Sequence, residues 1–196
     1  MNDQQHPLGS GFTAASTADE VLAGADLTGV NVIVTGGHSG IGLAATRALA
    51  RAGASVTVPA RDPDRAAANL AGTDRVQVHR MDLLDPVAVD AFADAWTTTG
   101  RPLHVLINNA AVPAPSSAVR DSRGFEVQFA TSHLGHFQLT LALHDALRAA
   151  HGARVVNVSS GAHRFGTIRW DDPNFTRGYD PGVAYAQAKL ANVRSA

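Results

Sequence analysis

The sequence contains no cysteine, no marked excess of charge and no long apolar run. The lack of cysteine excludes disulfides and thiolate chemistry and leads us to expect a reducing, cytoplasmic location. A formal net charge of -1 gives no indication of nucleic acid or an anionic membrane as a partner. No apolar run approaches the roughly 18 residues of a membrane span, and residues 1–11 show no basic-then-apolar signal pattern.

Histidine is plentiful, with nine residues, and raises the question of a metal centre. Only His133 and His136 come close to a metal-motif spacing, and no carboxylate stands with them. We therefore predict no metal site and a structural role for this pair.

The length of 196 residues suits one hydrophobic core, so we predict a single domain over residues 13–196 after a flexible tail over residues 1–12. A capping box, Thr17 to Glu20, predicts a short helix after the tail. Strand-like runs then alternate with helical stretches. We expect strands at 30–35, 55–58 (ended by Pro59), 76–81, 103–108 and 154–159, and helices at 63–70, 86–96, 125–150 and from about 182. This alternation predicts an α/β fold with a doubly wound parallel sheet in the order 3-2-1-4-5.

The segment Val32 to Gly42 runs from an apolar strand through a glycine-rich turn into a helix. In this context glycines allow the backbone to approach a phosphate, and the helix start favours its negative charge. A tight turn that binds nothing is the alternative.

Four further motifs follow this turn along the chain, three of them after predicted strands and one in the last predicted helix. They are Asp82 after the third strand, Asn108-Asn109-Ala110-Ala111 after the fourth, Val158-Ser159-Ser160 after the fifth, and Tyr185-x-x-x-Lys189 in the last helix. Together with Thr35-Gly36-x-x-x-Gly40-x-Gly42, this set resembles the classical short-chain dehydrogenase/reductase family. The sequences Tyr185-Ala-Gln-Ala-Lys-Leu-Ala-Asn and His133-Leu-Gly-His-Phe resemble its retinol-dehydrogenase-like and WW-domain-oxidoreductase-like branch.

The resemblance implies a Rossmann-type fold and an NAD(P)-dependent oxidoreductase that transfers a hydride to or from an alcohol/carbonyl substrate. It implies catalytic roles for Ser160, Tyr185 and Lys189. The cofactor-binding residues that it implies are Thr35, Gly36, Ser39, Gly40, Ile41, Gly42, Arg61, Asp82, Leu83, Asn109, Ala110, Tyr185 and Lys189.

The chemistry of the Tyr185 and Lys189 pair agrees with this reading. Residues four apart share one helix face, and a nearby ammonium favours the phenolate of a tyrosine whose reference pKa is about 10. Such a tyrosine can act as an acid or a base on the substrate oxygen. Purely structural roles remain as alternatives. Tyr185 and Lys189 could be an exposed pair on a helix, and Ser160 could cap the end of a strand. Asp82 could be a turn residue, and Thr35 could support the turn.

The residues after the second strand favour NADP(H) over NAD(H). Asp62 lies about 20 positions beyond the glycines, where an acid selects NAD. It is already explained as a helix cap before Pro63. The NAD-selecting acid of the family stands where this chain has Ala60, and Arg61 follows as in relatives that prefer NADP.

Two features depart from the family pattern. Ser132 stands where the family has an asparagine that helps to hold a water of the proton relay, so Ser132 is a candidate for that role. The sequence ends about seven residues after Lys189, whereas family members continue with further strands. We therefore expect a sheet without the last strands of the family and a chain truncated after the catalytic helix. The alternatives are a catalytically inactive nucleotide-binding domain and an unstable fragment; association into a homo-oligomer is a further option.

Overall fold

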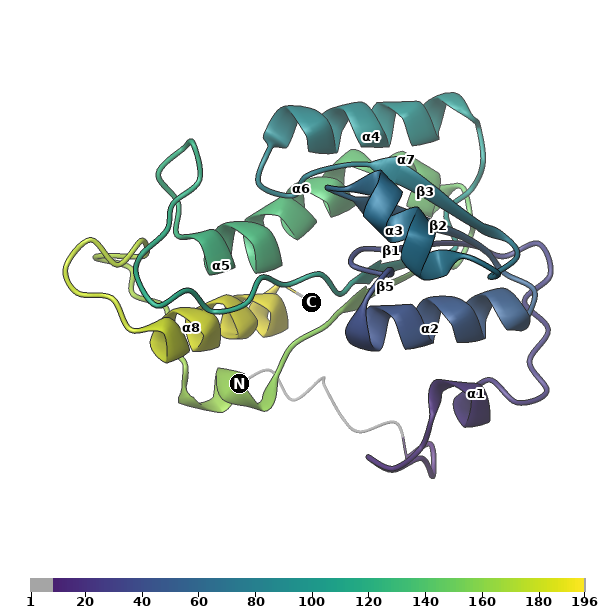
Figure 1. Cartoon of the computed structure of the whole chain (residues 1–196), viewed down its shortest axis with the longest axis horizontal. Helices are drawn as coiled ribbons and strands as arrows, with labels where there is room; N and C mark the ends of the chain where they lie inside the picture. The colour runs from purple at the N-terminus through teal and green to yellow at the C-terminus, as the bar shows by residue number, and fades with distance from the viewer. Residues whose placement is uncertain (1–8, 196) are drawn as a thin grey trace.

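One parallel sheet organises the computed structural model, which describes residues 9–195. Its strands are β1 (Asn31–Val34), β2 (Ser55–Ala60), β3 (Val76–Arg80), β4 (Val105–Asn108) and β5 (Arg154–Asn157). They lie in the order β3-β2-β1-β4-β5, which confirms the predicted fold and strand order (Figure 1). The strand bounds agree with the predicted ones within two residues.

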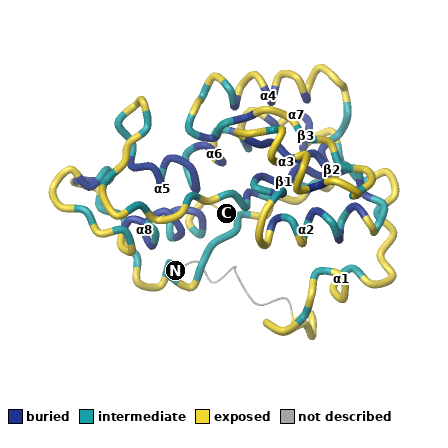
Figure 2. Tube along the Cα trace, viewed as in Figure 1, coloured by how far each residue is buried: buried dark blue, intermediate teal, exposed yellow. Residues whose placement is uncertain are grey.

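Helices cover both faces of the sheet (Figure 1). On one face, α2 (Gly40–Arg51) and α3 (Pro63–Leu70) pack on Val32, Val34, Val56 and Val58. On the other face, α4 (Pro86–Thr98), α6 (Gly135–Ala142) and α7 (His144–Arg148) pack around Ile33 and Leu106. Successive residues of β1 thus point to opposite cores, as the two-residue period of a strand requires. The burial colours show both cores as dark segments beneath exposed helix faces (Figure 2).

The predicted helix starts are confirmed by their caps. Thr17 and Glu20 form the capping box of α1 (Ala18–Val21). Asp62 accepts a hydrogen bond from the Arg65 amide at the start of α3, and Asp85 caps α4 in the same manner. Each of these two helices begins with a proline, whose missing amide proton is not needed there.

The prediction that Pro59 ends the second strand is wrong, because Pro59 lies within β2. The Val56 amide donates to the carbonyl of Arg75, just before β3, and the Ser55 amide donates to the carbonyl of Val30, just before β1. By this alternation the nitrogen of Pro59 faces the β1 side, where pairing has already ended at Thr57. The proline therefore removes no hydrogen bond from the ladder, which is the condition for tolerating it in a strand.

The predicted continuous helix over residues 125–150 is also wrong. The structure divides it into α5 (Val127–Phe129), a π-helical turn (Ala130–Leu134), α6 and α7. At Gly135, directly after the π turn, a Cβ would collide with the Leu83 carbonyl oxygen, so the helix packs very closely on the loop after β3. Periodicity in the sequence does not reveal such a local widening of the helix, which requires specific tertiary contacts.

The last helix, α8 (Pro181–Arg194), follows a short 3-10 helix (Gly161–Phe165) and an irregular segment. Strand β5 forms the edge of the sheet, as expected, and leaves Val155 and Val156 exposed. Within residues 9–195, no helix combines the length and apolar character that crossing a bilayer requires. The tail prediction for residues 1–12 falls mostly on residues 1–8, which lie outside the described residues.

Candidate active site

A cleft of about 520 Å³ runs along the carboxyl ends of the central strands. Its walls come from the segments that follow β1, β2, β3 and β4, on both sides of the point where the strand order reverses. This is the place where open α/β sheets bind ligands. All the predicted cofactor residues before Tyr185 line this cleft, namely Thr35, Gly36, Ser39, Gly40, Ile41, Gly42, Arg61, Asp82, Leu83, Asn109 and Ala110.

The glycine turn forms a cradle that side chains would fill. A Cβ at Gly42 would collide with the Gly36 carbonyl oxygen and lie 2.5 Å from the Asn109 side-chain nitrogen. Gly40 has a φ of +50° and open space where a side chain would point. Ser39, the N-cap of α2, makes no side-chain cap bond, and Ile41 is 81% exposed. The first turn of α2 thus offers amide groups, a free hydroxyl and an apolar side chain, which fits a dinucleotide.

Thr35 holds the glycine turn to the end of β4. Its hydroxyl oxygen accepts hydrogen bonds from the amides of Asn109 (2.9 Å) and Ala110 (3.0 Å), and the Asn109 side chain donates to the Thr35 carbonyl (2.9 Å). Because Thr35 is fully buried and its hydroxyl is engaged, its side chain supports the turn, the alternative already considered from the sequence.

His136 extends this network to the π turn. Its Nδ1 lies 3.0 Å from the Ser132 carbonyl oxygen, and its Nε2 lies 2.8 Å from the Thr35 hydroxyl. A carbonyl can only accept, so Nδ1 carries the proton and Nε2 accepts from Thr35. Burial lowers the pKa of His136 from 6.5 to about 4, and the positive charge of Lys189 acts in the same direction. His136 is therefore neutral near pH 7, and both its nitrogens are occupied.

Tyr185 and Lys189 lie on α8 beside the end of β5. The Lys189 ammonium is 5.8 Å from the centroid of the Tyr185 ring and donates to the Val158 carbonyl oxygen at 3.0 Å. Lys189 is only 3% exposed, which excludes the alternative of an exposed helix pair. Burial also lowers the pKa of Lys189, because it disfavours the charged form.

Ser160 begins the 3-10 helix after β5. Its hydroxyl oxygen accepts from the Ala162 amide at 3.2 Å, so Ser160 caps the start of the 3-10 helix rather than the end of a strand. Among residues 9–195 its hydroxyl proton has no acceptor, which leaves it available to donate to a substrate oxygen. The preceding Ser159 is already engaged, because its hydroxyl donates to the Lys189 carbonyl at 2.8 Å.

Two residues outside the predicted set support Lys189. The Asn192 side chain donates to the same Val158 carbonyl at 3.2 Å, and its oxygen accepts from His133 Nδ1 at 3.3 Å. The sequence contained a signal for both, since they belong to the two motifs of the retinol-dehydrogenase-like branch. The contact between them joins residues 59 positions apart and could not be inferred from either motif alone.

The π turn carries two buried hydroxyls without partners among the described residues. Ser132 is 1% exposed and Thr131 is 6% exposed, and Thr131 also lines the cofactor cleft. Buried polar groups are nearly always hydrogen-bonded, so two neighbouring buried hydroxyls without a partner indicate a place where water or a ligand binds. Thr131 was not predicted as a site residue.

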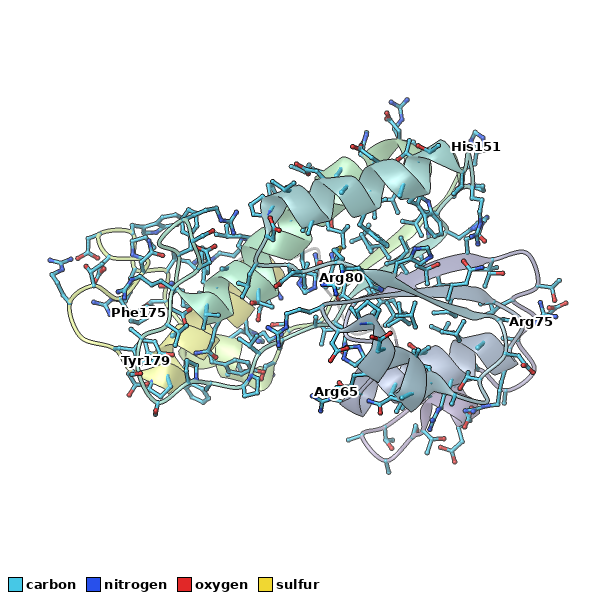
Figure 3. The ribbon with its side chains drawn as sticks, turned by 45° about the horizontal axis from the view of Figure 1, so that its top comes forward. Arg65, Arg75, Arg80, His151, Phe175 and Tyr179 are labelled. Carbon is cyan, nitrogen blue, oxygen red and sulfur yellow. The ribbon has the colours of Figure 1, made fainter. Side chains whose placement is uncertain are left out.

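Four polar residues that line the cleft and are wholly or partly exposed form its rim: His38, Arg61, Asp62 and Arg65. Arg65 projects from the first turns of α3 (Figure 3). One carboxylate oxygen of Asp62 accepts from the Arg65 amide at 3.1 Å, which supports its role as a cap. Asp82 likewise accepts from the Leu84 amide at 3.0 Å, as a turn residue does, while it lines the cleft. His38 and Arg65 were missed from the sequence.

Within the described residues, no group of three or more His, Cys, Asp or Glu side chains is placed to hold a metal ion. His133 and His136, the pair considered from the sequence, point to different partners.

Comparisons with known proteins agree with this geometry. The family model described as short chain dehydrogenase matches residues 30–171. The "Probable oxidoreductase" of Streptomyces lividans is 46% identical over 174 residues, which cover 86% of this chain and 58% of that protein. Retinol dehydrogenase 12 of Bos taurus is 42% identical over 174 residues, covering 85% and 54%. The chain thus spans little more than half the length of these relatives.

Solved structures show the same fold. An uncharacterized protein from Mycobacterium paratuberculosis has a TM-score of 0.79 and 38% identity, over 93% of this chain and 63% of that one. A metagenomic short-chain oxidoreductase in complex with NADP has a TM-score of 0.68 and 28% identity, over 86% and 74%. The chain belongs to the short-chain dehydrogenase family and resembles its retinol dehydrogenase branch.

Proposed function

We propose that this protein is an oxidoreductase that transfers a hydride between NADP(H) and a small alcohol or carbonyl substrate. The observation that carries the proposal is the buried Lys189 ammonium beside the Tyr185 ring, at the end of β5 and close in sequence to Ser160. When bound, a nicotinamide cofactor supplies or accepts the hydride.

The side chains of this protein would carry out the proton transfer and bind the substrate oxygen. Tyr185, with the Lys189 ammonium 5.8 Å from its ring centroid, gives a proton to a carbonyl oxygen or takes one from an alcohol. Ser160 donates its free hydroxyl proton to the same substrate oxygen. Ser132 and Thr131, whose buried hydroxyls have no partner among the described residues, would hold a water in place of the asparagine of the family.

The residues that line the cleft would hold the cofactor. Gly40, Ile41 and Gly42 would bind the pyrophosphate, and Asp82 and Leu83 would contact the adenine. Asn109 and Ala110 would steady the floor of the cleft, and Lys189 would hold the nicotinamide ribose. Preference for NADP(H) is supported by Arg61 and Arg65 on the rim and by Ala60 at the strand end. Guanidinium groups bind phosphate oxygens well. The neighbouring structure of a metagenomic oxidoreductase contains NADP, which supports the same preference.

The first test is a fluorescence titration of the purified protein with NADPH and with NADH, accompanied by the melting temperature. We expect saturable binding, tighter for NADPH, and a raised melting temperature. Arg61→Ala should weaken NADPH binding about tenfold or more and leave NADH binding nearly unchanged. If Arg61→Ala keeps the full preference for NADPH, the role given to Arg61 is wrong.

The second test is turnover with a panel of simple alcohols and carbonyl compounds. Tyr185→Phe removes the proton donor without removing the ring, so activity should fall by two or more orders of magnitude. A wild-type protein that binds cofactor but turns over nothing would instead support the inactive nucleotide-binding domain. The cytoplasmic location and a homo-oligomeric state are further predictions, testable by fractionation and light scattering.

A further inference from the structure

The ring of His163 folds back on the backbone of Ser160. Its Nδ1 lies 2.6 Å from the Ser160 carbonyl oxygen, which also accepts from the His163 amide at 3.0 Å. Because a carbonyl can only accept, Nδ1 carries the proton in this contact. Among residues 9–195 this is the only hydrogen bond of the half-buried ring. The hydrogen-bonding capacity of the ring is therefore directed at Ser160.

The 3-10 helix fixes both polar groups of Ser160 that precede and follow its Cα in the turn. The Ala162 amide donates to the Ser160 hydroxyl oxygen at 3.2 Å, while His163 holds the Ser160 carbonyl. Since the hydroxyl oxygen accepts from Ala162, the hydroxyl proton is left to point away from that amide. A rotation of the Ser160 peptide would change this direction, and the bond from His163 opposes such a rotation.

The other end of the 3-10 helix is docked on α8 next to Tyr185. A Cβ at Gly166 would collide with the Ala186 carbonyl oxygen, so the two segments meet backbone to backbone. The Gly166 amide donates to the His163 carbonyl at 3.1 Å. His163 thus lies in a chain of contacts that runs from Ser160 to the residue after Tyr185. Through this chain the position of one proposed substrate contact depends on the position of the other.

We propose that His163 is a positioning residue, whose Nδ1–H fixes the Ser160 carbonyl and thereby aims the Ser160 hydroxyl at the oxygen on which Tyr185 acts. This role rests on the proposed function, in which Ser160 donates to the substrate oxygen. Protonation of Nε2 leaves the Nδ1–H in place, so the bond forms in either charge state of the ring. A displacement of about 1 Å at a reacting group can cost about a hundredfold in rate, so a bond that sets such a position affects kcat.

Two uncharged replacements that branch at Cγ separate the donor from the shape of the side chain. His163→Asn keeps an N–H donor at the atom that corresponds to Nδ1, since both nitrogens are bonded to Cγ. His163→Leu has carbon there and donates nothing. On the simple alcohol or carbonyl compound that the wild type turns over fastest, kcat of His163→Leu should fall about tenfold or more, and kcat of His163→Asn should stay within about threefold of wild type. Both variants should bind NADPH as the wild type does, and the melting temperature confirms that each folds.

Ser160→Ala tests whether His163 acts through Ser160. Residues that act as a unit are strongly non-additive in their effects on kcat. Adding His163→Leu to Ser160→Ala should therefore lower kcat no further. If His163→Leu lowers kcat by the same factor with and without Ser160, the positioning role is overturned and the ring supports the fold in general.

The tautomer of the ring is a readout that needs neither cofactor nor turnover. Two-bond proton–nitrogen correlation spectra of the protein at pH 8 show which ring nitrogen carries the proton, and His163→Asn identifies the signals of His163. We expect the proton on Nδ1. A ring that carries its proton on Nε2 alone overturns the contact and the positioning role with it.

The outcomes separate this role from the proposed function. If kcat of His163→Leu equals that of wild type while Ser160→Ala is impaired, His163 has no positioning role and the oxidoreductase mechanism stands. A kcat as low in His163→Asn as in His163→Leu also contradicts the role, because a donor at that atom would not suffice. If the wild type turns over no compound, the proposed function fails and the role of His163 fails with it, whatever the tautomer.

Discussion

The neutral state of buried His136 makes the stability of this protein depend on pH in a defined window. The folded protein holds the pKa of His136 at about 4, against 6.5 for an exposed histidine. The unfolded chain therefore binds a proton more readily than the folded one between these two values. By linkage, stability is fully present above pH 6.5, falls as the pH drops toward 4, and has lost the whole contribution below that.

The size of the effect follows from the same two values. Their difference corresponds to about 3 kcal/mol of unfolding free energy, a large share of the 5–15 kcal/mol typical of a domain. The structural cause is specific: a proton on Nε2 would remove the acceptor of the Thr35 hydroxyl and place a charge in a site that is 3% exposed.

Urea unfolding at pH 7.0, 6.0, 5.0 and 4.5 measures this contribution. His136→Gln cannot titrate, so its stability should be lower at pH 7 but should fall less steeply with decreasing pH. The other histidines, including His38 and His133, contribute equally to both slopes, so their contribution to the pH dependence cancels in the comparison. His144→Gln, at an exposed position, is the control and should keep the wild-type slope. Equal slopes in wild type and His136→Gln would refute the reasoning.

Two further predictions concern the cleft and the π turn. Gly42→Ala should weaken NADPH binding by at least tenfold and lower the melting temperature, because the added Cβ collides with the Gly36 carbonyl. Unchanged binding would show that the backbone of the turn can shift to accommodate the methyl group. Ser132→Asn should raise kcat severalfold with little change in cofactor affinity, because the longer amide reaches further toward a relay water than the buried hydroxyl does. If the kcat of Ser132→Asn is no higher than that of Ser132→Ala, residue 132 takes no part in proton transfer.

The strand order and the helix starts could be predicted because they depend on local rules. Alternating strands and helices imply a parallel sheet, and an aspartate before a proline caps a helix wherever it stands. Pro59 was placed outside the strand because the sequence does not tell where the pairing of β1 ends. The π turn was missed because it depends on close packing against Leu83 and on the bond from His136 to the Ser132 carbonyl.

The site was harder to predict where its contacts join distant segments. The family motifs placed Tyr185, Lys189 and the glycine turn, but the motif of the turn specifies no residue type at His38, and Arg65 lies inside a helix. Neither carries a motif, and only the folded cleft brings them beside Arg61. The bond between Thr35 and His136 spans 101 residues, so no local sequence pattern connects them.

These long-range contacts give a physical reason why the two branch motifs occur in one chain. The first motif contributes His136, which ties the π turn to Thr35 and so to the cofactor cradle. It also contributes His133, which orients Asn192 of the second motif, and Asn192 shares the Val158 carbonyl with Lys189. The cradle and the Lys189 ammonium are therefore both linked to one π turn. A change in that turn is expected to move the glycine cradle and the lysine together, which neither motif could achieve alone.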